Sequence, residues 1–359
     1  MDTLIIDVGC SYLKMAIYQG ERLCEWWKSP TPKTANEIVE SVSLQYWNIR
    51  QMDQYRISQT MVISYSDSVF YQMKNGKIDH VPVFTDIPIQ DGLPDYQVAG
   101  KPRNSELKGA GNYLLYLKNE VGLEWIDCIL PPSTFIARHL TGNRSWKKWD
   151  ITHASNSGMW DYKRSYWCKE MQPFIEADVI EAEVVSPGAV LYQEQIDEMR
   201  VLVGGMDSVF ANARDVPYSS KPYLSLGTWV TASVESYFIK RDRKSPTRFV
   251  IAPNGTILEQ LCFNAGSEDY EVAYQLTTDF FDKKFLNMMT PVIDVFGGWS
   301  ESGLHHWWHK HPYLRFRNIE PEGDSYLHRE AALYAQHSKR EADGLHLPID
   351  VHQPQELSI

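Results

Sequence analysis

The first twenty residues contain two apolar runs separated by a short polar break. Leu4-Ile5-Ile6 is a continuous aliphatic run, typical of a strand buried on both faces, and residues 12–18 predict a second strand. The residues between the runs are small or polar turn formers: Asp7, Gly9, Cys10 and Ser11. The pattern therefore predicts a hairpin with a carboxylate and a glycine near its tip.

Such a tip has two interpretations. Glycine lets another molecule approach the backbone, amides in a tight turn can bind an anion, and a carboxylate beside them can hold Mg²⁺. An ordinary hairpin with polar tip residues has the same composition. The first residues alone leave both interpretations open.

Strands and helices alternate along the rest of the first 200 residues. Apolar runs predict strands at 61–63 and 81–84, and Lys74-Asn75-Gly76-Lys77 predicts a hairpin turn. Helical spacing of apolar residues predicts helices at 36–47, 112–121 and 133–140. This mixture predicts an α/β fold.

The pattern starts again near residue 200. A strand at 201–203 runs into Gly204-Gly205-Met206-Asp207, and a helix is predicted at 209–214. A strand at 223–226 then ends in Gly227-Thr228, and a return strand is predicted at 231–237. Each half therefore has its own hairpin with a glycine and a small polar residue. We expect two domains, residues 1–200 and 201–359, packed together without a low-complexity linker.

Composition narrows the class of protein. A chain of 359 residues is long enough for two domains. The net charge of −11 argues against general binding to nucleic acid, which requires basic surface. Five scattered cysteines suit a reduced cytoplasmic protein, no run approaches the roughly 20 apolar residues needed to cross a bilayer, and no signal peptide is expected.

The motifs resemble, in order, those of the FGGY carbohydrate kinases, members of the actin-like ATPase superfamily. Residues 7–14 are similar to a D-x-G-T-S-x-x-K phosphate motif, with Cys10 in place of Thr, and Ile89-Gln90-Asp91 is similar to a W-Q-D substrate element. LPPSTFIARHLTG and DITHASNS resemble two further motifs. Other segments resemble the run into the catalytic aspartate, the second phosphate motif and the adenosine motif: 201–207, 226–228 and 295–300.

The resemblance implies a fold and a reaction. The fold would be two RNase-H-like domains with a central cleft, and the reaction ATP-dependent phosphorylation of a hydroxyl on a small sugar, polyol or sugar derivative. Asp207 would be the general base, although an aspartate there also suits a helix N-cap. Asp7 would organise Mg²⁺ through water, because Mg²⁺ keeps several of its waters.

The resemblance also assigns binding residues. Gln90 and Asp91 would bind substrate hydroxyls together with Asp207, although a polar surface loop has the same composition. The nucleotide and its phosphates would be bound by the following residues: Gly9, Cys10, Ser11, Lys14, Gly227, Thr228, Gly297 and Gly298. A homodimer is retained as an alternative to a monomer.

A departure from the family's chain length leaves a second function open. The family's chains are longer, and the shortfall lies between Asn254 and Thr290, on the nucleotide side. This favours, as the alternative, a degenerate member that binds sugar or nucleotide without efficient transfer. His305 and His309 have a helical spacing that can bind zinc, but no third ligand is evident, and a helix end carrying cationic and aromatic residues explains them as well.

Overall fold

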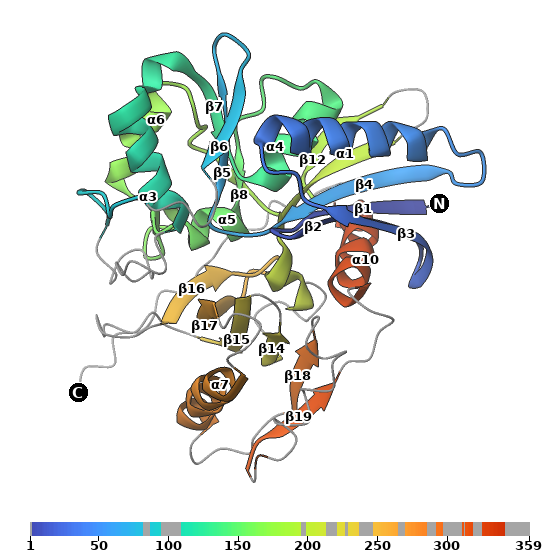
Figure 1. Ribbon diagram of the computed structural model, residues 1–359, viewed down its shortest axis with the longest axis vertical. Helices are drawn as coiled ribbons and strands as arrows, with labels where there is room; N and C mark the ends of the chain where they lie inside the picture. Colours follow the sequence, from blue (N-terminus) through green and yellow to red (C-terminus); the bar gives the residue numbers. More distant parts are fainter. Residues whose placement is uncertain are drawn as a thin grey trace.

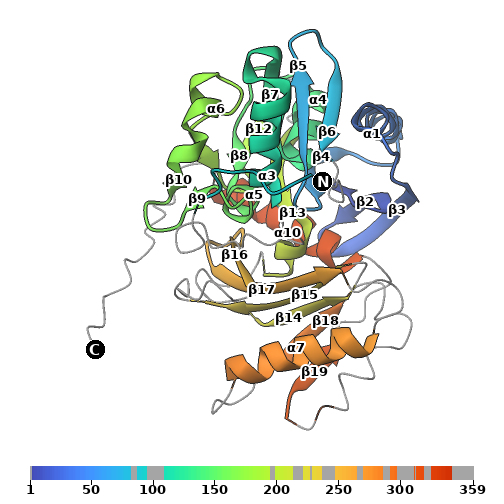
Figure 2. The same cartoon turned by 60° about the vertical axis from the view of Figure 1, so that its left-hand side comes forward.

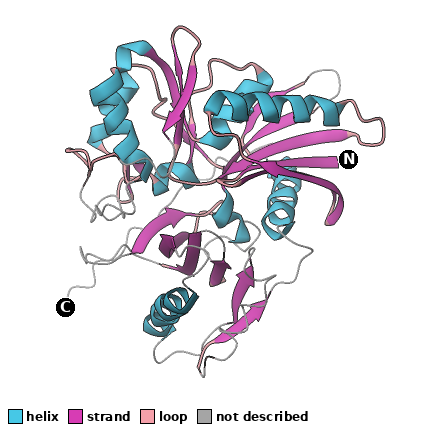
Figure 3. Cartoon of the chain, in the orientation of Figure 1, coloured by secondary structure: helices cyan, strands magenta, loops and turns pink. Residues whose placement is uncertain are grey.

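The chain builds two six-stranded sheets, one above the other in Figure 1. The structure is a computed structural model that describes residues 2–81, 87–94, 109–194, 199–212, 221–226, 229–236, 247–264, 270–285, 292–296, 311, 313–318 and 325–341. Helices lie against the faces of both sheets (Figure 3). The α/β class predicted from the sequence is confirmed.

The first sheet has the strand order β12-β13-β4-β1-β2-β3. β1 pairs antiparallel with β2 and parallel with β4, β4 pairs parallel with β13, and β2 pairs antiparallel with β3. The strands are β1 (Asp2–Val8), β2 (Tyr12–Gln19), β3 (Arg22–Pro30), β4 (Ile57–Ser64), β12 (Val190–Gln193) and β13 (Arg200–Met206). The predicted hairpin joins β1 to β2.

The second sheet repeats this arrangement with the order β16-β17-β15-β14-β18-β19. β14 pairs antiparallel with β15 and parallel with β18, while β17 pairs antiparallel with β15 and β19 pairs parallel with β18. The strands are β14 (Tyr223–Leu226), β15 (Trp229–Glu235), β16 (Thr247–Ile251), β17 (Ile257–Asn264), β18 (Val292–Phe296) and β19 (Arg315–Asn318). Five strands of each sheet therefore share one topology, which confirms the predicted internal repeat.

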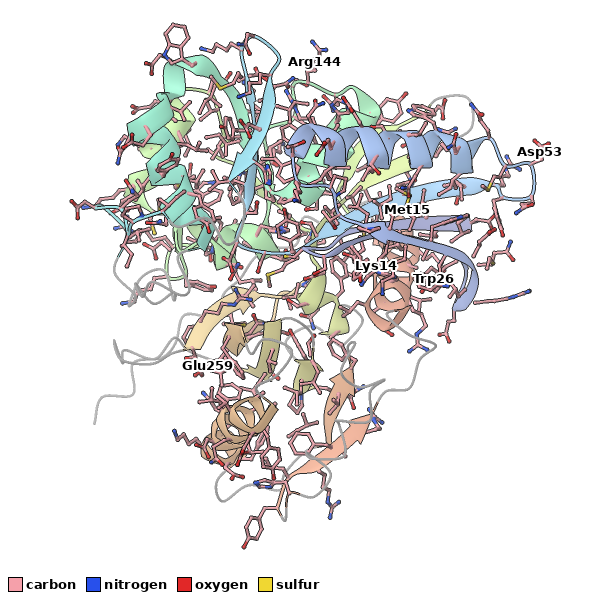
Figure 4. The ribbon with its side chains drawn as sticks, viewed as in Figure 1. Lys14, Met15, Trp26, Asp53, Arg144 and Glu259 are labelled. Carbon is pink, nitrogen blue, oxygen red and sulfur yellow. The ribbon has the colours of Figure 1, made fainter. Side chains whose placement is uncertain are left out.

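Helices cover both faces of the first sheet. α1 (Ala35–Arg50) and α4 (Pro132–Thr141) lie on one face, and α10 (Ser325–Glu341) lies on the other (Figures 1 and 2). The alternation along β2 follows this division, because Met15 packs in the α1 cluster whereas Ala16 packs in the α10 cluster. In Figure 4, Lys14 and Trp26 accordingly lie toward α10.

Local signals fix the ends of α1 and α4. Thr34 and Glu37 form a reciprocal capping box at the start of α1. α4 begins after Pro131 and ends at Gly142, whose φ of 65° is in the left-handed region. α7 (Tyr270–Phe285) packs on the second sheet.

The connection from β4 to β12 forms a separate layer beside the first sheet (Figure 2). It contains a three-stranded sheet of β5 (Val69–Met73), β6 (Ile78–Val81) and β7 (Ile126–Leu130), with the predicted turn between β5 and β6. Its helices are α3 (Gly109–Tyr116), η2 (Leu117–Val121), η3 (Leu123–Trp125), α5 (Ile151–Asn156), η4 (Lys169–Met171) and α6 (Gln172–Glu176). Short pairs complete it: β8 (Trp149–Asp150) with β11 (Val184–Val185), and β9 (Trp160–Asp161) with β10 (Tyr166–Trp167).

Two features differ from the sequence prediction. The helix expected at 209–214 is a 3₁₀ helix, η5 (Asp207–Asn212), that begins at Asp207 itself. The helix expected at 112–121 changes from α3 to a π-helical turn, η2. Both changes lie at the ends of buried elements, where tertiary packing overrides local propensity.

The first sheet draws on both sides of residue 200. β13 lies at positions 200–206 yet pairs with β4, and α10 returns from the end of the chain to pack on the same sheet. The chain passes to the second sheet only after η5. Among the described residues, no helix is both long and apolar enough to span a membrane.

Candidate active site

The hairpin between β1 and β2 is tightly closed at its tip. The Gly9 amide donates to the Tyr12 carbonyl at 3.0 Å, and a Cβ on Gly9 would lie 2.7 Å from that oxygen, so only glycine fits. Thr31 supports the tip, since its amide donates to the Ser11 carbonyl and its hydroxyl donates to the Gly9 carbonyl. Cys10 and Ser11 are exposed at this tip.

Asp7 lies near the end of β1 and is buried. Its Oδ2 is 2.9 Å from Nε2 of His328 on α10 and 3.6 Å from Nζ of Lys14 on β2. Lys14 therefore lies where the sequence predicted, beside the carboxylate of the phosphate motif. His328 was missed, because a contact between residues 321 positions apart leaves no local signal.

Asp207 follows β13 directly and opens η5. The Ser208 amide donates to its Oδ1. Burial and, after it, the charge of Asp7 raise the pKa of Asp207 to about 7, although the Ser208 amide and the cations Lys14 and His153 lower it. The side chain keeps partial contact with solvent. A carboxylate with this pKa is suited to accept a proton near neutral pH.

Two glycines allow the end of β13, which directly precedes Asp207, to pack closely against neighbouring segments. A Cβ on Gly204 would lie 1.8 Å from the Val62 carbonyl oxygen of β4, and one on Gly205 would lie 2.7 Å from Oγ1 of Thr152. The β13–β4 register shifts between Val203 and Met206, at these glycines. The backbone here approaches its neighbours more closely than any side chain allows.

A buried polar network at the start of α5 lies beside this strand end. Asp150 caps the helix through the His153 amide, and its Oδ2 is 2.8 Å from His153 Nδ1. The other ring nitrogen is 3.3 Å from both Ser64 Oγ and the Tyr65 carbonyl. Burial lowers the pKa of His153, but Asp150, the Tyr65 carbonyl and Asp207 together raise it above its ordinary value. The ring is thus favoured in its charged form.

A third carboxylate, Asp67, connects the two halves. It follows β4 with φ of 64°, accepts from Asn156 Nδ2 at 3.1 Å, and is 2.9 Å from Nη1 of Arg248 on β16. Arg248 is buried, and its Nε donates to Gln260, which donates to the Tyr223 hydroxyl at the start of β14. A continuous polar chain therefore crosses from one half to the other.

Apolar packing reinforces this crossing. Phe249 and Ile251 of β16 are buried in the core cluster of the first half, and the Ile251 amide donates to Ser155 Oγ on α5 at 2.9 Å. The two sheets therefore share one interface at β16.

The Cys10 thiol shows how close the carboxylates lie. Burial by the surrounding protein and the charges of Asp207, Asp7 and Asp67 together raise the pKa of Cys10 to about 12, although the side chain retains contact with solvent. Three carboxylates thus act on one thiol at the tip of the hairpin. Such a thiol stays protonated and is a poor nucleophile.

The acidic cluster fits Mg²⁺ held mainly through water. The charge of Asp7 raises the proton affinity of Asp207, and a divalent cation would neutralise these two carboxylates. Within the described ranges, no group of three or more His, Cys, Asp or Glu side chains is arranged to hold a metal. Mg²⁺, which keeps several waters and takes phosphate oxygens, matches this sparse donor set.

The other predicted residues are placed only in part. Gln90 uses its amide groups within its own layer, where Asn119 donates to its Oε1, its Nε2 donates to the Pro88 carbonyl and its backbone N–H donates to Asn112. Asp91 is exposed in the adjacent turn. These contacts match the surface-loop alternative and join neither residue to Asp207.

The predicted nucleotide glycines and the histidine pair lie outside the described residues: Gly227, Thr228, Gly297, Gly298, His305 and His309. β14 and β18, which are parallel neighbours, end at Leu226 and Phe296 directly before the glycines. His311 accepts from the amides of Tyr313 and Leu314, so this histidine serves a turn.

Solved structures identify the fold. The chain is similar to a gluconate kinase from Lactobacillus acidophilus, with a TM-score of 0.75 and 13% identity over 98% of this chain and 92% of that chain. A ligand-bound xylulose kinase from the same organism gives 0.73 at 13% identity, with the same coverage. Plasmodium falciparum glycerol kinase with ADP gives 0.69 at 10% identity over 95% of this chain and 90% of that chain. No protein-family model and no curated sequence matches the chain.

The chain therefore has the two-domain, actin-like fold of the FGGY-type carbohydrate kinases, as the resemblance in its motifs implied. At these identities the likeness establishes the fold. The activity has to be argued from the residues.

Proposed function

We propose that this protein is an ATP-dependent kinase that phosphorylates a hydroxyl of a small sugar, polyol or sugar derivative. The observation that carries the proposal is Asp207, a carboxylate with a pKa of about 7 beside Asp7 at the edge of the first sheet. Kinases of this kind need positioning, neutralisation of phosphate charge and a proton acceptor, rather than covalent chemistry from the protein.

The residues divide these tasks among themselves. Asp207 accepts the proton of the substrate hydroxyl as that oxygen bonds to the terminal phosphorus of ATP and the bond from this phosphorus to the bridging oxygen of ADP breaks. Lys14 and the backbone at Gly9 and Ser11 orient the phosphates. The buried Asp7 carboxylate would hold Mg²⁺ through water. Mg²⁺, when bound, would supply positive charge to the phosphates. We assign substrate binding to residues 1–200, and nucleotide binding mainly to 201–359.

A panel assay tests this function. Purified protein is given ATP and one sugar, polyol or sugar acid at a time, and ADP release is followed with Mg²⁺ and with EDTA. We expect release that depends on both Mg²⁺ and one acceptor class. Protein that binds nucleotide in calorimetry yet releases no ADP with any acceptor would contradict the kinase and support the alternative.

The alternative is a member of the fold that binds nucleotide or sugar without efficient transfer. One observation favours it: Lys14 and His328 both contact Oδ2 of Asp7, so one oxygen of the carboxylate proposed to hold Mg²⁺ already has protein partners. Asp207 favours the kinase, because a pure binder has no need for a carboxylate with a raised pKa at this place.

A further inference from the structure

The peptide that precedes Asp207 is held by a side chain from a different part of the chain. The Met206 amide donates to Oγ1 of Thr152 at 2.8 Å. Thr152 lies in the first turn of α5 and is completely buried. A hydroxyl therefore satisfies the last amide of β13, one residue before Asp207.

This hydroxyl cannot turn away from the amide. Thr152 Oγ1 donates its own proton to Asp150 Oδ1, so its lone pairs are left to accept from Met206. Asp150 in turn is fixed by the His153 amide and ring, and its own side chain is fully buried. The chain of donors and acceptors therefore has one direction, from Met206 to Thr152 to Asp150.

The pairing of β13 with β4 is interrupted just before this point and resumes at Met206, which lies opposite Ser64. Gly204 and Gly205 lack side chains, and the register with β4 shifts between Val203 and Met206. A Cβ at Gly205 would lie 2.7 Å from the same Oγ1 of Thr152. β13 and α5 can therefore approach this closely because residue 205 is glycine. The end of β13 is thus held by its pairing with Ser64 and, from α5, by the Thr152 hydroxyl.

We propose that Thr152 is a positioning residue, whose hydroxyl, oriented by Asp150, fixes the end of β13 and with it the Asp207 carboxylate. The proposal rests on the proposed function, since it assigns Thr152 a role in the reaction of Asp207. Small displacements of a reacting group cost large factors in rate, so the anchor has a catalytic consequence without touching substrate.

A graded series of variants tests the proposal. Thr152→Ser keeps the hydroxyl, Thr152→Cys gives a weaker acceptor of similar size, and Thr152→Val removes it while preserving shape. With the acceptor found in the panel assay, we expect kcat near wild type for Ser, about 3–10-fold lower for Cys and about 10–100-fold lower for Val. KM should change less than about threefold, because the substrate contacts are untouched.

A matched control separates position from stability. Thr277 on α7 is equally buried, and its hydroxyl donates to the Ala273 carbonyl within the second half. Thr277→Val should lower the melting temperature without lowering kcat. Equal losses of kcat in Thr277→Val and Thr152→Val would overturn the proposal.

The double variant gives the sharpest result. Once Asp207→Asn has removed the base, Thr152→Val has nothing left to position and should lower the residual rate by less than about twofold. If Thr152→Val instead reduces the residual rate by the same factor as in wild type, its role is structural and the proposal is wrong. Should Thr152→Val not fold, the same comparison with Thr152→Cys decides.

Hydrogen exchange does not depend on turnover, so it distinguishes failure of the Thr152 proposal from failure of the proposed kinase function. With ¹⁵N-methionine labelling, the Met206 amide should exchange with solvent at least tenfold faster in Thr152→Val than in wild type or in Thr277→Val. Unchanged exchange would contradict the anchor even in an active enzyme. If the amide responds but no acceptor is phosphorylated by wild type, the anchor stands and the kinase function fails.

Discussion

The two sheets share the order and directions of five strands but carry different chemistry. In the first sheet, β1 ends beside Asp7 and β13 runs into Asp207, and both carboxylates act on the Cys10 thiol. In the second sheet, the strand that corresponds to β1 is β14, which runs into Gly227-Thr228 and has no carboxylate at its end. One scaffold thus places the proposed proton acceptor in one half only.

The connections between equivalent strands differ as well. Between β4 and β13, residues 65–199 build the layer that contains Asp67, α3 and α5, whereas residues 297–314 join β18 to β19. The second half contributes in another way, because β16 packs against α5 and α10 returns to the first sheet. The first half therefore carries the acidic site. The second half contributes β16 and α10, which pack against the first half.

The largest expected effect tests whether Asp207, in the first half alone, is the proton acceptor. Asp207→Asn should fold normally and lose phosphoryl transfer by about two to four orders of magnitude, the usual contribution of general acid–base assistance. The measurement is kcat with the acceptor found in the panel assay. Turnover close to wild type would exclude Asp207 as the general base. The first half would then have no proposed proton acceptor to distinguish it from the second.

The next effect tests how the second half is joined to the first. Arg248 is buried in its contact with Asp67, so Arg248→Met leaves that carboxylate without its cation at a place with little water. We expect a loss of about 3 kcal/mol in the free energy of unfolding, as is typical when one partner of a buried pair is removed. Urea unfolding at neutral pH measures it.

An exposed pair within the first half provides the control. Lys77 and Asp79 lie 3.1 Å apart, with the Lys77 side chain 68% exposed, so Lys77→Met should change stability by less than about 0.5 kcal/mol. If Arg248→Met is equally mild, the polar chain across the halves contributes little and β16 joins them through apolar packing alone.

The sequence was informative where signals are local. The hairpin tip at Gly9 and the helix at 133–140, between Pro131 and Gly142, depend on residues close together in the sequence, and the structure confirms both elements. β3 was missed, because its adjacent Trp26 and Trp27 lack the simple alternation of a half-buried strand. β3 is an edge strand of its sheet, where this pattern is weakly constrained.

The site was predictable only in its motifs. Asp7, Lys14 and Asp207 were expected and do lie in one electrostatic cluster. The contacts of His328 with Asp7 and of Arg248 with Asp67 were not, because each joins segments far apart in the chain. Partners across a domain interface are chosen by tertiary packing, which no local pattern encodes.

A smaller effect concerns stability and pH. The pKa of Asp207 is raised from 3.8 to about 7, so the folded state binds this proton more tightly than the unfolded state. The stabilisation is complete below about pH 4 and is lost as pH rises through 7. Asp207→Asn, which cannot ionise, should therefore be more stable than wild type at pH 8 and nearly equal at pH 4.

The expected gain at pH 8 is about 2 kcal/mol, less than the ~4 kcal/mol of a full three-unit shift, because the carboxyl retains solvent contact. Urea unfolding in EDTA measures it without bound metal. Asp53, exposed at the outer end of the first half (Figure 4), provides the control, and Asp53→Asn should change stability little at either pH. A gain at pH 4 as large as at pH 8 would contradict the raised pKa.

The smallest effect concerns the base of the nucleotide, which the proposed function assigns to the second half. Residues 254–290 hold β17 and α7 in the described part, one strand and one helix where the family resemblance led us to expect more. Adenine recognition needs an apolar slot with a few polar groups, whereas amides at a hairpin bind phosphate without distant loops. We therefore expect the protein to bind ATP and GTP with affinities that differ by on the order of 1–2 kcal/mol, the scale of one or two hydrogen bonds. Calorimetry with ATP, GTP and inorganic triphosphate, each with Mg²⁺, measures the difference. A preference for ATP of a hundredfold or more would show that the second half builds a complete adenine pocket. The second half would then supply specificity for the base, although it carries no proposed proton acceptor.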